Sequence, residues 1–266
     1  MMLSYGELLS PEPIQTSVGK IKKHTLREIA RLTFDRFGIY QSLLKATPEE
    51  IYLKFLDDEK RSDWETLDDD TKSSMTLYDI IANEETIRSL YCTVLDFFFV
   101  ENISFLEGVF VVTKTKIDSE NDLSSDNIVG FITRDHFQEV IDVLQQICCI
   151  NSKSGADVEP KFKNEIARRM FEKMQKAKEA EEKRKSAKMQ MEYSIPNIAS
   201  SVSNKHPSIN PINVWDLTLF QLIDSFNRTQ INAVYDIQST RVSVWGDEKK
   251  AFDETLWFKY NHDIDK

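Results

Sequence analysis

The sequence has few of the residues that usually mark a disulfide scaffold, a metal site or a phosphate loop. Its 266 residues include only three cysteines, four histidines and seven glycines. Cys92, Cys148 and Cys149 lack the spacing of a disulfide framework or a zinc ribbon, so we expect buried free thiols in a reducing compartment. No glycine-rich motif of the kind that cradles phosphate groups occurs in the chain.

Catalytic patterns are equally scarce. The four histidines are scattered at His24, His136, His206 and His262. None has a second histidine or a cysteine pair at the spacing that zinc sites and activated nucleophiles usually show. We therefore expect a protein that is not an enzyme and that uses neither a metal nor another cofactor.

Long apolar runs and an excess of positive charge are also missing. No run approaches the roughly 20 apolar residues of a membrane helix, and residues 1–7 lack the basic and apolar regions of a secretory leader. The net charge of −10 disfavours a surface that binds nucleic acid throughout, although it is compatible with a local basic patch. We expect an acidic, cytoplasmic protein with no membrane partner.

Apolar periodicity predicts a mainly α protein with a small antiparallel β-hairpin or sheet, which is an α+β fold class. Thr25 and Glu28 have the spacing of a capping box, and Thr47 marks a second helix start. Gly38 is expected to break the first helix, and a later helix is expected from Thr76 through Phe98. β-Branched and aromatic residues predict a hairpin at 103–117 and a third strand at 128–132, with a helix after Thr133.

Composition divides the chain into three parts. We expect an N-terminal α+β domain at 1–150, a linker with a charged helix at 151–194, and a helical, aromatic-rich C-terminal interaction region at 195–266. Basic residues between 161 and 188 are interleaved with glutamates, which favours a solvated helix face over an arm for nucleic acid. The acidic run 57–70 lacks the alternating ligands of a calcium loop, so we expect a solvated linker or helix face there.

The C-terminal quarter is the most informative part of the sequence, because it carries three of the four tryptophans among turn residues and charges. The candidate partner-binding residues are its large aromatic side chains, Trp215, Phe220, Trp245, Trp257 and Phe258. We expect the first two to pack the helix that Asn213 caps, about 214–240, onto its own domain or onto a second copy in a homo-oligomer. The last three are expected to anchor a partner. The alternative is that all five cover the small core of their own domain.

Two stretches carry a recognisable pattern. Residues 14–37 contain Gly19-Lys-Ile-Lys-Lys-His-Thr-Leu-Arg-Glu-Ile, and residues 206–228 contain Leu217-Thr-Leu-Phe-Gln-Leu, with further similarity at Trp245-Gly-Asp and Trp257-Phe-Lys. This pattern resembles tail assembly chaperones of long-tailed phages and prophages of Firmicutes. The resemblance implies a non-catalytic, cytoplasmic helper in the bacterial host that binds the tape-measure protein and tail-tube subunits during virion assembly.

The predicted hairpin at 103–117 departs from that family, whose members are often shorter and wholly helical. Two alternatives therefore stay open. One is a structural tail or head-tail connector component of a phage particle. The other is a nucleic-acid-binding accessory protein that uses the basic helix between 161 and 188.

Overall fold

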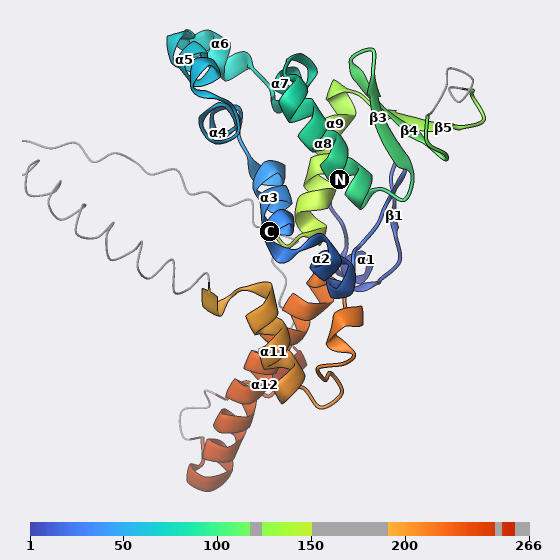
Figure 1. Ribbon diagram of the computed structural model, residues 1–266. Coiled ribbons are helices and arrows are strands. Elements are labelled where there is room, and N and C mark those ends of the chain that lie inside the picture. The colour runs from blue at the N-terminus through green and yellow to red at the C-terminus, as the bar shows by residue number, and fades with distance from the viewer. Residues whose placement is uncertain (118–123, 151–190, 248–251, 259–266) are drawn as a thin grey trace, which may run out of the picture. The chain divides into compact units, whose positions relative to one another are not determined.

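The computed structural model describes residues 1–117, 124–150, 191–247 and 252–258, and Figure 1 shows their helices and strands. The chain separates into two compact units. Among the described residues, unit 1 comprises 1–150 together with 215–221, and unit 2 comprises the others. The predicted linker and charged helix fall mainly on residues 151–190, which lie outside the described part of the chain.

The fold is mainly helical with small antiparallel sheets of two and three strands, which confirms the predicted α+β class. The helices of unit 1 are α1 (Tyr5–Leu9), α2 (Leu26–Leu32), α3 (Phe34–Lys45), α4 (Pro48–Lys54), α5 (Asp58–Thr66), α6 (Asp69–Ser74), α7 (Leu77–Asn83), α8 (Glu85–Phe98) and α9 (Arg134–Ile147). Its strands are β1 (Ile14–Gln15), β2 (Lys20–Ile21), β3 (Asn102–Leu106), β4 (Val109–Thr113) and β5 (Ile128–Ile132). The acidic run 57–70 thus lies on two short helices, α5 and α6.

The predicted hairpin and third strand are confirmed, and they form an antiparallel sheet in the order β3-β4-β5. Ile103 pairs with Val112, and Val111 pairs with Phe131. Contacts join α8 to β3 and α9 to β5, so these two helices lie beside the sheet, as Figure 1 shows. The apolar stripe of α8, including Tyr91, is buried in the core of unit 1.

Gly130 allows the N-terminal segment to approach this sheet closely. A Cβ atom at position 130 would lie 2.7 Å from the carbonyl oxygen of Val18 and 2.9 Å from its Cα, which is closer than real Cβ contacts come. Val18 lies between β1 and β2 and is itself buried. The missing side chain therefore lets the backbone at Val18 pack directly on β5.

Capping boxes begin α2, where the sequence predicts one, and α4, where the sequence predicts a helix start. The Thr25 hydroxyl accepts a hydrogen bond from the Glu28 N–H at 3.3 Å, and the Glu28 carboxylate accepts one from the Thr25 N–H at 2.9 Å. Thr47 and Glu50 form the same reciprocal pair, at 3.2 Å in both directions. Each box satisfies two backbone amides that have no partner inside the helix.

Two predicted helix boundaries in unit 1 are wrong. α3 runs through Gly38 without a break, because burial of Phe37, Leu43 and Leu44 on one face outweighs the roughly 1 kcal/mol that a helical glycine costs relative to alanine. The break lies earlier, at Thr33, whose φ of 85° ends α2 and starts α3.

The predicted helix from Thr76 through Phe98 is two helices, α7 and α8, separated at Glu84. The last carbonyls of α7 find partners outside a continuous helix. The guanidinium of Arg88 donates hydrogen bonds to the carbonyls of Ile81 and Ala82. The side-chain amide of Asn83 donates one to the carbonyl of Asp79 at 2.8 Å.

Unit 2 contains α11 (Ile195–Lys205), most of α12 (Leu219–Trp245) and the short 3-10 helix η3 (Leu256–Phe258). The ring of Tyr193, just before α11, packs edge-on against Phe226 of α12 with centroids 6.2 Å apart. The buried apolar residues of unit 2 are Ile198, Ala199, Val202, Val214 and Leu222.

The helix expected from 214 after an Asn213 cap starts later than predicted. Residues Val214–Asp216 form only a 3-10 turn, η2. Asn213 instead exchanges hydrogen bonds with Asn210, at 2.7 and 3.1 Å. A further capping box begins α12, in which the Thr218 N–H donates to the Gln221 side chain at 2.9 Å and the Gln221 N–H donates to the Thr218 hydroxyl at 3.3 Å.

Candidate functional site

The C-terminal half of α12 exposes a stripe of large apolar side chains. At about 100° per residue, Val234, Ile237, Val244 and Trp245 fall within roughly 100° of the helix circumference. Their exposed fractions are 47%, 71%, 65% and 80%. We call these four residues the α12 stripe. A surface helix normally turns such a stripe toward a core, so the exposed α12 stripe is a candidate binding surface.

The chain that follows α12 packs on a different face of the helix. The ring of Tyr235 packs against that of Phe252 at a centroid distance of 5.5 Å. The Phe252 N–H donates a hydrogen bond to the Asp247 carboxylate at 2.9 Å, which holds the returning chain. Unit 2 therefore uses the Tyr235 face of α12 for its own packing and leaves the α12 stripe exposed.

Trp257 and Phe258 form a second exposed aromatic group, on η3. Their exposed fractions are 52% and 56%, and their rings pack edge-on with centroids 4.9 Å apart. Asp253 organises this short helix, because its carboxylate accepts hydrogen bonds from the N–H and the hydroxyl of Thr255, at 3.0 and 2.6 Å. The pair is thus presented by a defined backbone.

Trp215 and Phe220 lie in a different environment, within unit 1. Trp215 is half-buried, and Phe220 is only 7% exposed and packs edge-on against Tyr5 at 6.1 Å. Phe220 therefore contributes to the core of unit 1. Of the five candidate residues, Trp245, Trp257 and Phe258 are the three with exposed rings.

The segment 215–221 packs on the rest of unit 1 through long-range contacts that the sequence pattern does not predict. The Leu26 N–H, at the start of α2, donates to the Leu217 carbonyl at 2.8 Å, and Thr25 bridges Thr218 in antiparallel fashion. Further along, the Gln221 amide donates to the Leu9 carbonyl at 2.9 Å. The one signal in the sequence is the Thr-x-x-Gln spacing of 218 and 221, which marks a helix start but not its neighbour.

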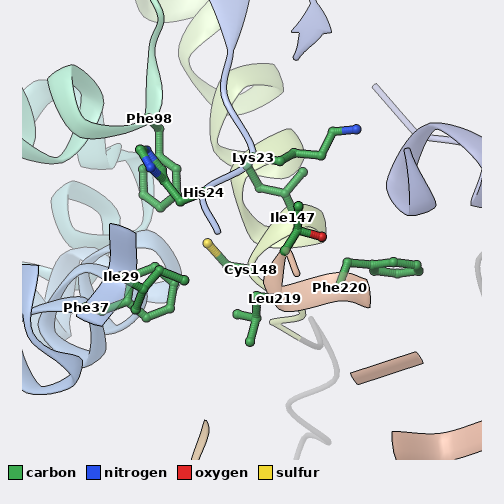
Figure 2. Close-up of a pocket in the computed structure, with 10 residues that line it drawn as sticks. Lys23, His24, Ile29, Phe37, Phe98, Ile147, Cys148, Leu219 and Phe220 are labelled. Atoms are coloured by element: carbon green, nitrogen blue, oxygen red, sulfur yellow. The ribbon is translucent and has the colours of Figure 1, made fainter. Parts of the chain in front are cut away.

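A small cavity lies where this segment meets the rest of unit 1. It measures about 10 Å³, no more than one water molecule occupies. Figure 2 shows Cys148 near the middle of its lining, with Leu219 and Phe220 on one side and Ile29 and Phe37 on another. The cavity is too small for a substrate or a cofactor.

Titratable groups around this cavity have structural partners. Burial lowers the pKa of His24, whose ring stacks on Phe97 at 3.8 Å. Burial also lowers the pKa of Lys23, and its ammonium donates hydrogen bonds to the carbonyls of Glu7 and Ser10 near the C-terminal end of α1. These bonds satisfy carbonyls that have no helical partner.

The cysteines of the chain are free. Burial raises the pKa of the Cys148 thiol well above its usual value and that of Cys149 to about 12. Burial raises the pKa of Cys92 as well. All three are therefore protonated near neutral pH, a state in which thiols are poor nucleophiles.

None of the helices in the described ranges is long and apolar enough to cross a membrane. Within the same ranges, no three histidine, cysteine, aspartate or glutamate side chains gather at distances suited to a metal ion.

Comparison with known proteins gives one match. Residues 182–261 match the family model described as the YomV second domain, a phage-derived family from Bacillus. The match covers less than a third of the chain, and it includes α11, α12 and η3 with the α12 stripe, Trp257 and Phe258. No curated protein and no solved structure matches the chain. The match is consistent with a phage protein.

Proposed function

We propose that this chain is a non-catalytic phage assembly protein that acts by binding other proteins through its C-terminal region. The observation that carries the proposal is the exposure of the α12 stripe and of Trp257 and Phe258, at fractions between 47% and 80%. Large aromatic side chains are enriched among the residues that dominate protein interfaces.

The family match supports a phage context for this surface, because the matched residues include every side chain in it. The exposed groups are hydrophobic, with Arg241 the one charged side chain within the arc of the α12 stripe. Such a surface suits an apolar partner segment better than a nucleic-acid backbone, which requires several basic contacts.

The finer proposal is a tail assembly chaperone that binds the tape-measure protein and the tail-tube subunit of the same phage. It rests on the resemblance of 14–37 and 206–228 to such chaperones. A structural tail or head-tail connector component is the alternative. The two differ in one outcome, because a chaperone leaves before the particle is complete and a structural component stays in it.

The test is a double variant, Trp257→Ala with Phe258→Ala, co-expressed with the tape-measure and tail-tube proteins. Truncation of an interface anchor typically costs about 2 kcal/mol, so we expect roughly thirtyfold weaker binding. Thermal unfolding should be unchanged, because both side chains are more than half exposed. Mass spectrometry of purified virions then separates the chaperone from the structural component.

The matched control is Phe131→Ala, which removes a 45% exposed aromatic ring from β5 of unit 1. It should bind both partners as the unaltered chain does. A double variant that stays folded and retains full binding would show that this surface is wrong. A double variant that unfolds would show that Trp257 and Phe258 belong to the core of their own unit.

A further inference from the structure

Unit 1 has a surface feature whose residues are separate in the sequence from the C-terminal region. Residues of α4, α5 and α6 and their flanks line a surface cleft of about 570 Å³. The lining includes Pro48, Glu49, Trp64, Asp69 and Met75. Ligand sites in proteins usually have volumes of about 300 to 1,000 Å³, so this cleft is large enough for a side chain and its backbone.

Trp64 is the aromatic group of the cleft. Its side chain is held firmly, because the residue is only 7% exposed and its ring stacks on Tyr52 at 4.9 Å with an interplanar angle of 22°. Its indole N–H donates no hydrogen bond to any residue that the structure describes. A tryptophan in this position offers a π face for a cation and one donor for a carbonyl oxygen.

A cation of the chain already lies over this ring. The ammonium of Lys72 is 5.8 Å from the centroid of Trp64, close to the limit of about 6 Å for a cation–π contact. The same ammonium donates a long hydrogen bond of 3.4 Å to the Glu65 carbonyl. Lys72 is therefore weakly held and can give way to a better placed cation.

Two carboxylates of the lining have no cationic partner. Glu49 and Asp69 are exposed and form no ion pair with any described residue. Two nearby carboxylates do have cationic partners, since Glu50 pairs with Lys54 at 2.6 Å and Asp58 pairs with Arg61 at 3.1 Å. Glu49 and Asp69 are thus free to pair with a cation from another molecule, and both line the cleft.

The charge of the surrounding segment favours a basic ligand. Ten acidic and four basic side chains occur between Thr47 and Met75, an excess of six negative charges in a chain whose net charge is −10. A field of this sign raises the association rate of basic partners and is strongest at low ionic strength.

We propose that the cleft binds a lysine or arginine side chain in a basic segment of a partner protein. The cationic group lies between Glu49 and Asp69, and its aliphatic stem packs on Trp64 in place of Lys72. The indole N–H of Trp64 donates a hydrogen bond to a backbone carbonyl of the same segment. This site does not depend on the proposed function, because the C-terminal surface includes none of these residues.

The probe for the test is a fluorescein-labelled peptide of alternating lysine and glycine, added to the full-length protein at low salt and followed by fluorescence anisotropy. The main variant is Glu49→Gln with Asp69→Asn, which we expect to weaken binding about tenfold. The matched control is Glu59→Gln with Asp70→Asn. It removes the same charge from exposed positions on α5 and α6 outside the cleft, and should weaken binding less than about twofold.

A second variant tests the competition with Lys72. Lys72→Ala should tighten peptide binding, whereas Lys54→Ala, with the same change of charge, should have less effect because Lys54 does not line the cleft. Three outcomes would overturn the proposal. They are equal losses in the two carboxylate variants, equally tight binding of a peptide whose lysines are acetylated, and absence of binding to the unaltered protein.

Discussion

The guanidinium of Arg27 donates two hydrogen bonds to Oδ1 of Asp216, from Nε at 3.2 Å and from Nη2 at 2.8 Å. The two residues are 189 positions apart in the sequence and meet beside the bridge between Thr25 and Thr218. This relationship places the segment 215–221 at the start of α2. Because the side chains are 48% and 66% exposed, the ion pair contributes little to the stability of this contact.

Replacing Arg27 should therefore have a small effect. We expect Arg27→Ala to lower the free energy of unfolding by about 0.5 kcal/mol, since exposed ion pairs seldom contribute more than about 1 kcal/mol. Urea unfolding measures the change. Arg31→Ala, at an exposed position later in the same helix, is the control and should have no larger effect. A loss above about 2 kcal/mol for Arg27→Ala alone would contradict this prediction.

Phe220 should matter much more than Arg27. Its side chain is 7% exposed and packs against Tyr5, so Phe220→Ala leaves a cavity in unit 1 and should cost about 3 kcal/mol. Phe131→Ala removes the same ring at a 45% exposed position and should cost less than about 1 kcal/mol. Similar losses in the two variants, measured by urea unfolding, would mean that Phe220 is not part of the core.

Glu28 should give unit 1 a sensitivity to acid. Burial raises the pKa of the Glu28 carboxyl, but hydrogen bonds from Lys22 and the Thr25 N–H, with the charges of His24 and Lys22, outweigh it and lower the pKa to about 2. A carboxyl whose pKa is lowered in the folded state stabilises the fold fully at pH values above its pKa in the unfolded chain, which is near 4.5. This contribution is lost as the pH falls from 4.5 toward 2.

The variant Glu28→Gln should remove this contribution. We expect it to be about 1 kcal/mol less stable at pH 7, because solvent screens a partly exposed carboxylate, and to lose less stability than the unaltered chain between pH 4.5 and 2. Urea unfolding at a series of pH values measures both effects. Glu59→Gln, at an exposed position of α5, should leave the pH profile unchanged. Parallel profiles for Glu28→Gln and the unaltered chain would contradict the prediction.

The three thiols should differ in reactivity. Burial raises the pKa of each, but Cys148 is buried whereas Cys92 and Cys149 are only partly covered. At pH 8 we expect a disulfide reagent to modify Cys148 far more slowly than Cys92, and all three at one rate in denaturant. Mass spectrometry of a time course identifies the modified cysteines. The control is Cys92→Ser, which should remove the fast modification assigned to Cys92. Rapid modification of Cys148 in the folded protein would be the contrary result.

Local signals in the sequence predicted local structure well. The boxes at Thr25 and Thr47 use residues three positions apart, so the helix starts can be read without knowledge of the fold. The strands of the β3-β4-β5 sheet were likewise marked by β-branched and aromatic residues. The predicted helix break at Gly38 was wrong, because burial of Phe37 outweighs the free-energy cost of a glycine within a helix. That burial depends on residues distant in the sequence.

The exposure of the candidate site residues could not be predicted from the sequence. Phe220 and Trp245 belong to the same aromatic-rich region, yet one is 7% and the other 80% exposed, a difference that long-range contacts of the segment 215–221 decide. The role of the exposed residues in binding a partner stays a prediction. The cleft at Trp64 could not be foreseen, because its lining comes from three helices whose packing no local spacing encodes.

Gly130 offers a way to recognise distant relatives of unit 1. The backbone of Val18 occupies the space that a Cβ atom at position 130 would need, so every other amino acid should be rejected there, alanine included. Most core positions accept several apolar residues of similar volume and drift as sequences diverge. A glycine near the middle of the third strand of a β3-β4-β5 sheet is therefore a more durable marker of common ancestry than the hydrophobic positions around it.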